Sequence, residues 1–404
     1  MNWKVVPLEQ LAAREDSAIK IGPFGSQLRK CDLVPSGIHV VGIENVVKEK
    51  FNGFGERYIT AEKFHSLRSV EVRSGDLLIT MMGTVGEVAV VPPGTATSVM
   101  DSHLLRFRPN LEVCSPQFVA WLIKGSPVVR AAIQGRAHGA IMKGLNSSLI
   151  RTLPAPLPPL AEQERIVKLL DEADELRKLR VQADRHTAAL IPSLFHEMFG
   201  DQNFPIVALR ELATKERNSL TNGPFGSDLL SSELTDSGVP VIYIRDISSG
   251  NYKRKSTVCV TPAKAAELEF CNAKPGDVLV AKVGAPPGIA AVYPAKEPHA
   301  IVTQDVIRIR PNVERALSVY VEGFLNSSLG LEEVRNITIQ ATRQRFSLGQ
   351  FKEINVPLPP LSPQKEFAAR VSEIRAVQAE QAASRCHLDD LFQSLMYRAF
   401  KGEL

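Results

Sequence analysis

Two stretches of the chain carry one narrow apolar stripe on an otherwise charged helical pattern. Each is about 35 residues long, which as a helix would make a rod of about 50 Å. A helix with one narrow apolar stripe must bury it against a partner, and we predict that the two helices bury theirs against each other. The alternative is that each helix packs separately on its own domain. The stripe residues are Ile166, Leu170, Ala173, Leu176, Ala183, Leu190 and Leu194 in the first stretch, and Phe367, Val371, Ile374, Val377, Leu388, Leu391 and Leu395 in the second.

A different pattern precedes each of these stretches. Short β-type runs such as "HVVGI", "DLLIT" and "EVAVV" in the first half, and "VPVIYI" and "DVLVA" in the second, are separated by Gly and Pro turns. The segment 115–133 has helical spacing. Such a pattern predicts mixed domains dominated by strands, hence an α+β fold. The sequence "PLPPL" then stands before each long helix, and its prolines keep the chain extended there.

The two halves of the chain repeat each other at an offset of 201 residues. "GPFGS" begins at Gly22 and again at Gly223, and "PLPPL" begins at Pro156 and Pro357. "RFRPN" and "RIRPN" match with a slip of one residue. A unit of about 200 residues is far larger than a solenoid repeat, so each copy should have its own core. We predict globular domains at 1–155 and 201–356 and long helices at 156–200 and 357–404.

The composition is that of a soluble globular protein. The 404 residues have a formal net charge of +4, so nucleic-acid contacts would have to come from local basic clusters. Five cysteines, an odd number without a C-x-x-C pair, predict buried, reduced thiols. No apolar run reaches the roughly 18 residues of a membrane helix, and the first residues do not resemble a signal peptide. We expect a cytoplasmic protein.

No motif in the sequence carries catalytic chemistry. "FNGFG" has the F-x-G-x-G form of methyltransferases that use S-adenosylmethionine, but "VVKEK" precedes it and no N-P-P-[YF] motif accompanies it. "GTVG" and "GAPPG" lack the lysine and hydroxyl of a phosphate-binding loop. We interpret all three as turns, and we expect a chain that is not itself an enzyme and holds no metal.

Polar and basic loops at matched positions are the candidate binding sites. The turn Gly22-Pro23-Phe24-Gly25 should anchor Phe24 in the core and present the following residues outward. Arg and Gln suit base edges, whereas Lys and Ser suit phosphates. Any single residue is equally consistent with a solvated surface, so the prediction depends on the loops recurring. The candidate DNA contacts are Ser26, Gln27, Arg29, Lys30, Arg136, His138 and Lys143 in copy one, and Asn222, Ser227, Asp228, Lys253, Arg254, Lys255, Arg343, Gln344 and Arg345 in copy two.

A domain with GPFGS and [SP]-G-D-[LV]-L, then P-L-P-P-L-x-x-Q and a long helix, all duplicated, resembles the specificity subunit of type I restriction-modification systems. The resemblance implies two target recognition domains joined by an antiparallel coiled coil with pseudo-two-fold symmetry. Each domain would read one half of a split, double-stranded DNA target. The helices would set the spacer and dock two modification subunits. Those partners would bind S-adenosylmethionine and methylate adenine, and restriction subunits would cut DNA with ATP and Mg.

The resemblance also indicates Glu162, Gln163 and Gln364 as partner-docking residues. Copy two has Ser-Pro-Gln where copy one has Ala-Glu-Gln, so it lacks the carboxylate of Glu162. The loops differ between the copies, "QLRK" against "DLLS", which predicts an asymmetric target. The alternatives are the recognition subunit of a type IIB-like enzyme, a stand-alone methyltransferase and a coiled-coil adaptor that does not bind DNA.

Overall fold

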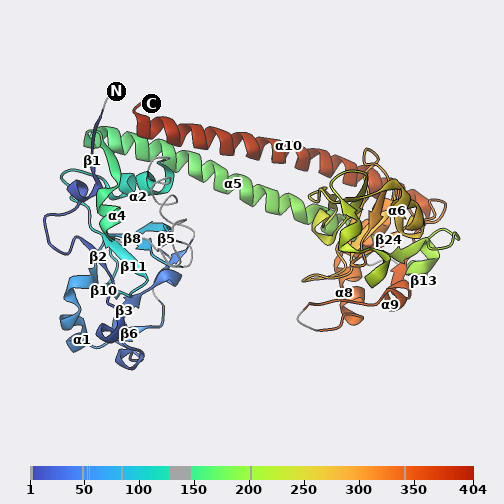
Figure 1. Ribbon diagram of the computed structural model, residues 1–404, viewed down its shortest axis with the longest axis horizontal. Coiled ribbons are helices and arrows are strands. Elements are labelled where there is room, and N and C mark those ends of the chain that lie inside the picture. Colours follow the sequence, from blue (N-terminus) through green and yellow to red (C-terminus); the bar gives the residue numbers. More distant parts are fainter. Residues whose placement is uncertain are drawn as a thin grey trace. The chain divides into compact units, whose positions relative to one another are not determined.

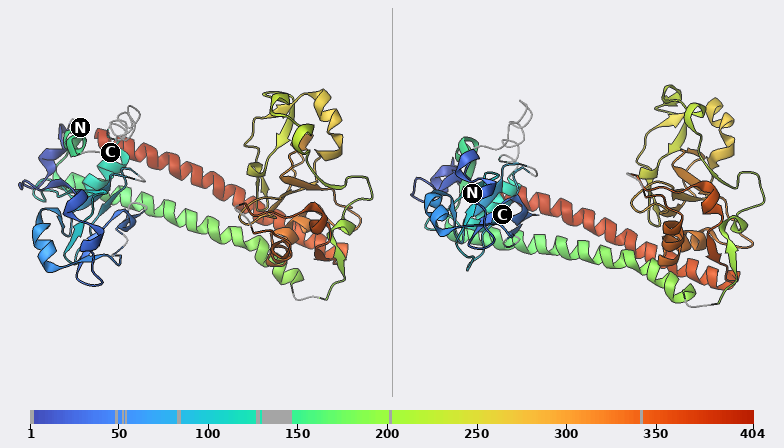
Figure 2. Two further views of the ribbon diagram at one scale, coloured as in Figure 1. Left: turned by 60° about the horizontal axis from the view of Figure 1, so that its bottom comes forward. Right: turned by 90° about the horizontal axis from the view of Figure 1, so that it is seen from below.

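The computed structural model describes residues 3–47, 50–51, 53, 55–82, 85–126, 129, 147–200, 203–340 and 343–404. The chain forms two compact units, one made of Met1–Val181 with Ser384–Leu404 and the other of Gln182–Ala383. Figures 1 and 2 show that each unit combines a strand-rich head with parts of two long helices. None of the helices in the described ranges has the length and apolar character of a membrane span.

Unit 1 contains two four-stranded sheets. One has the order β2-β11-β8-β9 and the other the order β6-β3-β10-β7, with β3 and β10 parallel. Along β8 the side chains alternate, because Leu77 and Ile79 face one core cluster and Leu78 faces the other. The strands are β1 (Lys4–Pro7), β2 (Ile19–Ile21), β3 (Ile38–Val41), β4 (Val46–Val47), β5 (Lys50–Phe51), β6 (Tyr58–Ile59), β7 (Glu71–Val72), β8 (Leu77–Thr80), β9 (Val88–Val90), β10 (Ser98–Met100), β11 (Leu104–Phe107) and β12 (Pro154–Leu157).

Unit 2 repeats this topology. Its sheets have the orders β14-β24-β21-β22 and β15-β19-β16-β23-β20, and β16 and β23 are again parallel. The strands are β13 (Ile206–Ala208), β14 (Leu220–Asn222), β15 (Leu234–Thr235), β16 (Val239–Ile242), β17 (Ile247–Ser248), β18 (Asn251–Tyr252), β19 (Cys259–Val260), β20 (Asn272–Ala273), β21 (Val278–Ala281), β22 (Ala290–Val292), β23 (Ala300–Val302), β24 (Val306–Ile309) and β25 (Asn355–Pro357). The predicted duplication of a strand-rich α+β domain is confirmed.

The structure locates the one-residue insertion that shifts the register between the two copies. β8 and β21 begin 201 residues apart, at Leu77 and Val278, whereas β9 and β22 begin 202 apart, at Val88 and Ala290. The extra residue of copy two therefore lies in the loop 282–289, which contains "GAPPG".

Shorter helices cover the sheets, and two long helices follow the PLPPL elements. β12 pairs with β1 and β25 pairs with β13, both antiparallel, so each proline-rich segment forms an edge strand before its helix begins. The helices are α1 (Ala61–Ser66), α2 (Pro116–Gly125), α4 (Ser147–Thr152), α5 (Leu160–Phe199), α6 (Pro262–Glu267), α7 (Ser318–Asn326), α8 (Ser328–Asn336), α9 (Leu348–Lys352) and α10 (Leu361–Lys401).

The core of each head is completed by residues of both long helices. In unit 1, Ile166 and Leu170 of α5 lie in one cluster with Phe392, Met396 and Phe400 of α10. In unit 2 the corresponding cluster contains Phe195 and Phe199 of α5 with Phe367 and Val371 of α10. The ends of both helices are therefore integral parts of the heads, so packing on the heads and packing on the other helix occur together.

Within each unit α5 and α10 run antiparallel. In unit 1 Arg177 donates to Asp389 at 2.7 Å, and in unit 2 Thr187 donates to Gln381 at 2.7 Å. Position numbers rise along α5 as those of their partners fall along α10, as an antiparallel pair requires. The boundary between the two units crosses both helices, α5 between Val181 and Gln182 and α10 between Ala383 and Ser384. The predicted boundaries between head and helix segments stay a prediction.

The apolar stripes are buried only at the ends of the helices. Ile166, Leu170, Phe367 and Val371 are at most 1% exposed. Nearer the middle, the prediction of a buried stripe was wrong, because one partner helix covers only part of a helix surface. The exposed stripe residues are Leu176 (55%), Leu190 (46%), Val377 (48%) and Leu391 (66%).

The cysteine prediction was correct only in part. Cys114, Cys259 and Cys271 are buried, and Cys31 and Cys386 are exposed. Burial raises the pKa of Cys114 and Cys271 to about 12, which keeps both thiols protonated and unreactive at neutral pH.

Candidate nucleic-acid interface

The GPFGS loops have the same backbone geometry in both units. A Cβ atom on Gly22 would lie 1.8 Å from the carbonyl oxygen of Asp101, and one on Gly223 would lie 1.9 Å from that of Val302. Gly25 and Gly226 have φ angles of +54° and +49°, in the left-handed region that glycine favours. Both loops therefore need glycine at their first and fourth positions, which holds the intervening Pro-Phe pair in one conformation.

The phenylalanine of this loop does not anchor it, contrary to the sequence prediction. Phe24 is 61% exposed and Phe225 is 57% exposed. Leu28 and Leu229 pack against the cores instead. The 3-10 turns η2 (Gly25–Gln27) and η7 (Gly226–Asp228) follow the phenylalanines, and four positions later the chain returns to the core.

The residues after Phe24 are exposed, as predicted. Ser26, Gln27, Arg29 and Lys30 all lie at the surface. The Gln27 side chain accepts a hydrogen bond from the backbone N–H of Phe24 at 3.3 Å. Arg29 donates from Nε to the carbonyl of Ser26 at 3.3 Å. In unit 2 Asp228 is exposed, and the backbone of Ser227 lies in η7.

A hollow of about 680 Å³ lies beside the GPFGS loop of unit 1. Lys20, Lys63 and Arg151 line it together with Phe24 and one acidic residue, Asp16. Arg151 donates to the carbonyl of Ile19 at 3.0 Å, and Lys63 pairs with Asp32 at 3.1 Å. Sequence inspection missed these three cations because they come from three separate segments of the chain.

In unit 2 the structure brings together three loops that are far apart in sequence. The Lys282 ammonium lies 5.4 Å from the centre of the Phe225 ring. The residue after it, Val283, forms a backbone bridge with Arg345, and Gly284 donates to the carbonyl of Gln344 at 3.2 Å. The GPFGS loop, the loop 282–289 and the predicted basic loop at 343–345 therefore form one surface. Arg343 and Arg345 are exposed on it.

Lys282 was not among the sequence candidates. Partial burial lowers its pKa; Asp305 acts in the opposite direction, and Arg345 adds to the lowering. Lys282 is a single lysine directly after a buried strand, and no sequence pattern distinguishes such a lysine from an ordinary surface residue. Its partner at the matched position of unit 1 is Met81, so the two copies differ in charge here.

Asn222 does not reach this surface, which corrects its selection as a DNA contact. It is 6% exposed and its amide donates to the carbonyl of Gly223 at 3.1 Å. It lies in β14 with its side chain packed in the protein interior, so it is not available to a ligand.

The segment 252–256 is shaped by the buried Asp246, which ends the 3-10 turn η9 (Ile244–Asp246). Asp246 accepts hydrogen bonds from the backbone of Lys255 at 2.8 Å and Ser256 at 3.1 Å. Arg254 donates to the carbonyl of Ser256 at 3.1 Å. Lys253, Arg254 and Lys255 are exposed, so they remain candidates. Arg136, His138 and Lys143 lie outside the described residues.

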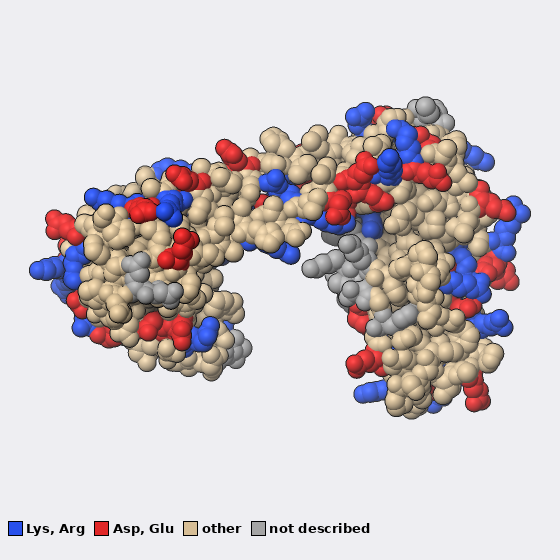
Figure 3. Space-filling view, turned by 180° about the vertical axis from the view of Figure 1, so that it is seen from behind, with Lys and Arg blue, Asp and Glu red and all other residues tan. Residues whose placement is uncertain are grey.

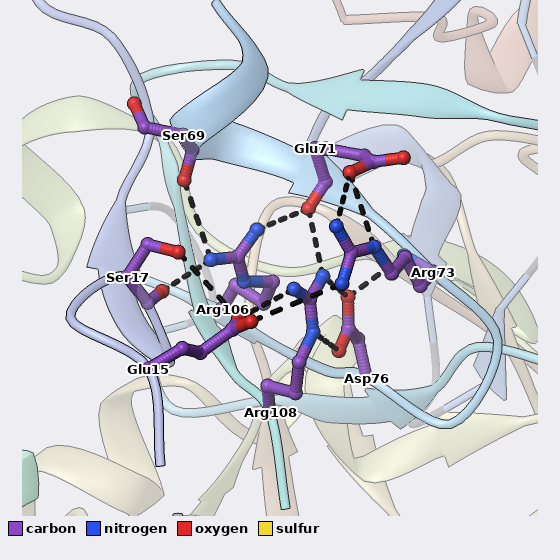
Figure 4. Close-up of polar contacts among 8 residues, drawn as sticks. All are labelled: Glu15, Ser17, Ser69, Glu71, Arg73, Asp76, Arg106 and Arg108. Carbon is purple, nitrogen blue, oxygen red and sulfur yellow. Dashed lines mark hydrogen bonds and ion pairs between the residues drawn. The ribbon is translucent and has the colours of Figure 1, made fainter. Parts of the chain in front are cut away.

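The arginines of "RFRPN" and "RIRPN" are structural. In unit 1 Arg108 makes a bidentate pair with Asp76 at 2.7 and 2.8 Å, and the adjacent Arg106 guanidinium donates to the carbonyls of Glu71 and Ser17 (Figure 4). Burial, reinforced by Arg108, lowers the pKa of Arg106 to about 10, so it stays charged. In unit 2 Arg310 repeats the pair with Asp277, at 2.9 Å for both bonds. These groups tie the sheets to their connecting loops.

Gln163 and Gln364 also have a structural role, which corrects their selection as docking residues. Both are fully buried. Gln163 donates to the carbonyls of Val113 and Pro158, and Gln364 donates to those of Arg315 and Pro359, all at 2.9 to 3.0 Å. Of the three selected residues only Glu162 reaches solvent, and it pairs with Arg165 at 2.7 Å.

The surface charge is mixed. Figure 3 shows Lys and Arg side chains interspersed with Asp and Glu over the face drawn there. Among the described residues no cluster of three or more His, Cys, Asp or Glu side chains could hold a metal ion.

Residues 226–382 match the type I restriction modification DNA specificity domain. The resemblance to specificity subunits is confirmed. The EcoBI specificity subunit of Escherichia coli is 23% identical over 312 residues, which cover 69% of this chain and 64% of that subunit. The putative MjaX specificity subunit of Methanocaldococcus jannaschii is 21% identical, over 84% of this chain and 80% of that one. This chain thus spans less than two thirds of the EcoBI subunit.

The fold is shared with a solved type I restriction-modification protein. A chain described under "Structural basis underlying complex assembly and conformational transition of the type I R-M system" superposes with a TM-score of 0.64. It is 19% identical, and the alignment covers 100% of this chain and 98% of that one. The two strand-rich heads and the long helices of this chain are therefore a fold that this solved protein shares.

Proposed function

We propose that this chain is the DNA-recognition subunit of a type I restriction-modification complex, in which each head reads one part of a bipartite target. The observation that carries the proposal is the duplication of one exposed loop on two heads of equal topology. Each GPFGS loop presents its side chains beside basic residues, Lys20 and Arg151 in unit 1 and Lys282 in unit 2. Such groups suit phosphate and base contacts.

The two halves of the target should differ in sequence. At matched positions around the loops, unit 1 has Lys20, Gln27 and Arg29 where unit 2 has Thr221, Asp228 and Leu230. A base edge that pairs with a glutamine amide or a guanidinium does not suit a carboxylate or a leucine. The proposed target is therefore asymmetric.

The long helices are the proposed docking surface for two copies of one partner. In unit 1 the exposed Leu176 and Leu391 line a groove of about 290 Å³ between α5 and α10. The repeat places Val377 and Leu190 at the equivalent positions of unit 2, and both are also exposed. Two equivalent apolar patches favour two copies of the same protein. We propose that these are modification subunits, which would bind S-adenosylmethionine, with restriction subunits supplying the ATP- and Mg-dependent cleavage.

Methylome sequencing of a host that carries the complete system tests this function. The expected result is adenine methylation in a motif of two short specific parts separated by unspecified bases, absent when the gene for this chain is deleted. A continuous or palindromic motif, or an unchanged methylome in the deletion strain, would contradict the proposal.

A further inference from the structure

The exposed phenyl ring at the tip of each GPFGS loop needs an explanation. Single exposed apolar side chains are common on protein surfaces. Phe24 and Phe225, however, keep the same residue type, loop position and exposure in both copies, while the third, fifth and sixth residues after them differ. Leu28 and Leu229 already anchor the loops, so the rings are not needed for packing. A function in binding accounts for their retention.

The loops hold the rings in a fixed position. The close approach of Gly22 and Gly223 to a neighbouring backbone fixes the start of each loop, and the left-handed Gly25 and Gly226 fix the turn after each ring. A ring presented on such a support loses little conformational freedom when it binds, so more of its contact energy is available for affinity.

Basic side chains lie beside both rings. In unit 2 the Lys282 ammonium lies 5.4 Å from the Phe225 ring centre, and Arg345 lies close enough to lower the pKa of Lys282. In unit 1 Phe24 lines the same hollow as Lys20 and Arg151. Asp305 and Asp16 accompany these groups, and the unit 2 loop adds the exposed Asp228, so each site places an apolar face beside cations in a mixed-charge setting. Stacked bases flanked by phosphates have the complementary character.

We propose that Phe24 and Phe225 contact DNA bases directly, each by stacking on or wedging beside a base of its own half-site. This proposal rests on the proposed DNA-reading function and assigns it two specific side chains. Aromatic rings and apolar wedges contribute contact with base faces that depends little on base identity. The two rings would then position the heads on the duplex, while the differing residues beside them select the bases.

Substitution of each ring in the complex with the modification subunit tests the proposal. The probe is a duplex that carries the methylated motif found in the host. Phe24→Ala and Phe225→Ala should each weaken binding by about 5-fold to 150-fold, the range for loss of one aromatic–base stack. Phe225→Trp should retain affinity, because the indole ring offers at least as large an aromatic face. Because no phosphate contact is removed, the salt dependence of binding should keep its slope.

Leu111→Ala and Val313→Ala are matched controls, because these residues are 66% and 64% exposed at another pair of equivalent positions. They should bind as the wild type does. Melting temperatures of all variants exclude unfolding. The tryptophan of Phe225→Trp gives a second readout, since stacking on a base should quench its added emission when motif DNA binds. Unchanged affinity in both alanine variants, or unchanged tryptophan emission on binding, would overturn the proposal.

The outcomes separate this inference from the proposed function. Wild-type affinity for the motif with no effect of either alanine variant would refute base contact and leave the DNA-reading function intact. Loss of the modification subunit from the alanine variants in size-exclusion chromatography would show that the rings bind protein and would also overturn the proposal. A wild-type complex that binds no motif DNA would remove both proposals.

Discussion

The backbone N–H of Ser115 donates a hydrogen bond to the side-chain oxygen of Gln163 at 2.9 Å. Leu317 and Gln364 repeat this contact at the same distance in unit 2. Each glutamine also donates to two carbonyls, one in the loop before the head's helix and one in the PLPPL element. The motif P-L-P-P-L-x-x-Q is therefore a joint that fixes the first turn of each long helix to its head.

Replacing either glutamine should destabilise its unit. Gln163→Ala leaves one backbone N–H and two carbonyls without their partner, at a cost of about 1–3 kcal/mol for each buried group that finds no water. The melting temperature by calorimetry should fall for Gln163→Ala and Gln364→Ala and stay unchanged for the control Glu164→Ala, whose side chain is exposed. Equal melting temperatures of all three variants would show that the glutamine contacts do not contribute to the stability of the units.

The basic surface of unit 2 should bind phosphates. Arg343→Ala combined with Arg345→Ala is expected to weaken binding of the complex to motif DNA and to reduce the salt slope by about 1 to 2, because up to two phosphate contacts are lost. Lys274→Ala with Lys296→Ala removes the same charge at the other end of the β21–β22 hairpin and should have no comparable effect. Filter binding over a salt series measures both. An unchanged slope in the arginine variant would exclude this loop from phosphate contact.

The groove between the long helices should carry one partner subunit in each unit. Leu391→Asp places a carboxylate among apolar side chains, and should reduce the number of bound modification subunits from two to one, as should Leu190→Asp. The double variant should bind none. Mass photometry of the co-expressed complex gives the stoichiometry. Gln393→Asp, an exposed position two residues along α10, is the control, and full assembly of the leucine variants would contradict the docking proposal.

The buried Glu322 should make the stability of unit 2 depend on pH. Burial raises the pKa of its carboxyl, and the opposing effect of Arg375 is smaller. A folded-state pKa above the unfolded value means that the folded state binds more protons. The stability contribution of Glu322 is therefore full below the unfolded pKa near 4.5 and decreases as pH rises through the folded value.

Comparison with Glu322→Gln, which does not titrate, isolates this effect. The melting temperature of the wild type relative to the variant should decline from pH 4.5 upward. A difference that stays constant with pH would mean that the carboxyl has an ordinary pKa in the folded protein.

Exchange of one head should change one half of the target. Replacing residues 201–356 with the matching segment of a known specificity subunit removes the GPFGS loop and the 343–345 loop of unit 2 together. The methylome of the resulting strain should keep one half of the motif and acquire a new second half. A change in both halves would refute independent reading by the two heads.

Much of the fold could be predicted from the sequence because its signals are local. The runs "DLLIT" and "DVLVA" became the buried strands β8 and β21, and the long stripes became α5 and α10. The repeat alone predicted two heads of one topology. The burial of the apolar stripes on α5 and α10 was predicted less well. Periodicity identifies the apolar face of a helix, but it does not show how much of that face a single partner helix covers.

The candidate site was harder to predict because its contacts are non-local. Gln163 was selected for docking, yet it bonds to backbone groups 48 and 50 residues away, which no local pattern reveals. Lys282 and Phe225 are far apart in the sequence, and only the folded chain brings the ammonium close to the ring. The loop phenylalanine was assigned to the core on hydrophobicity, but a leucine four residues later occupies that place.

Unit 1 is built from two segments that are far apart in the sequence, and this affects how it folds during translation. Its hydrophobic interior includes Phe392, Met396 and Phe400, which are synthesised more than 200 residues after Ile166 and Leu170, the α5 residues in the same cluster. About 200 residues separate Val181 from Ser384, so at translation rates of about 5–20 residues per second the nascent first head waits roughly 10 to 40 s for these side chains. During that interval the apolar face of α5 has no intramolecular cover, and a chaperone or a neighbouring nascent chain has access to it.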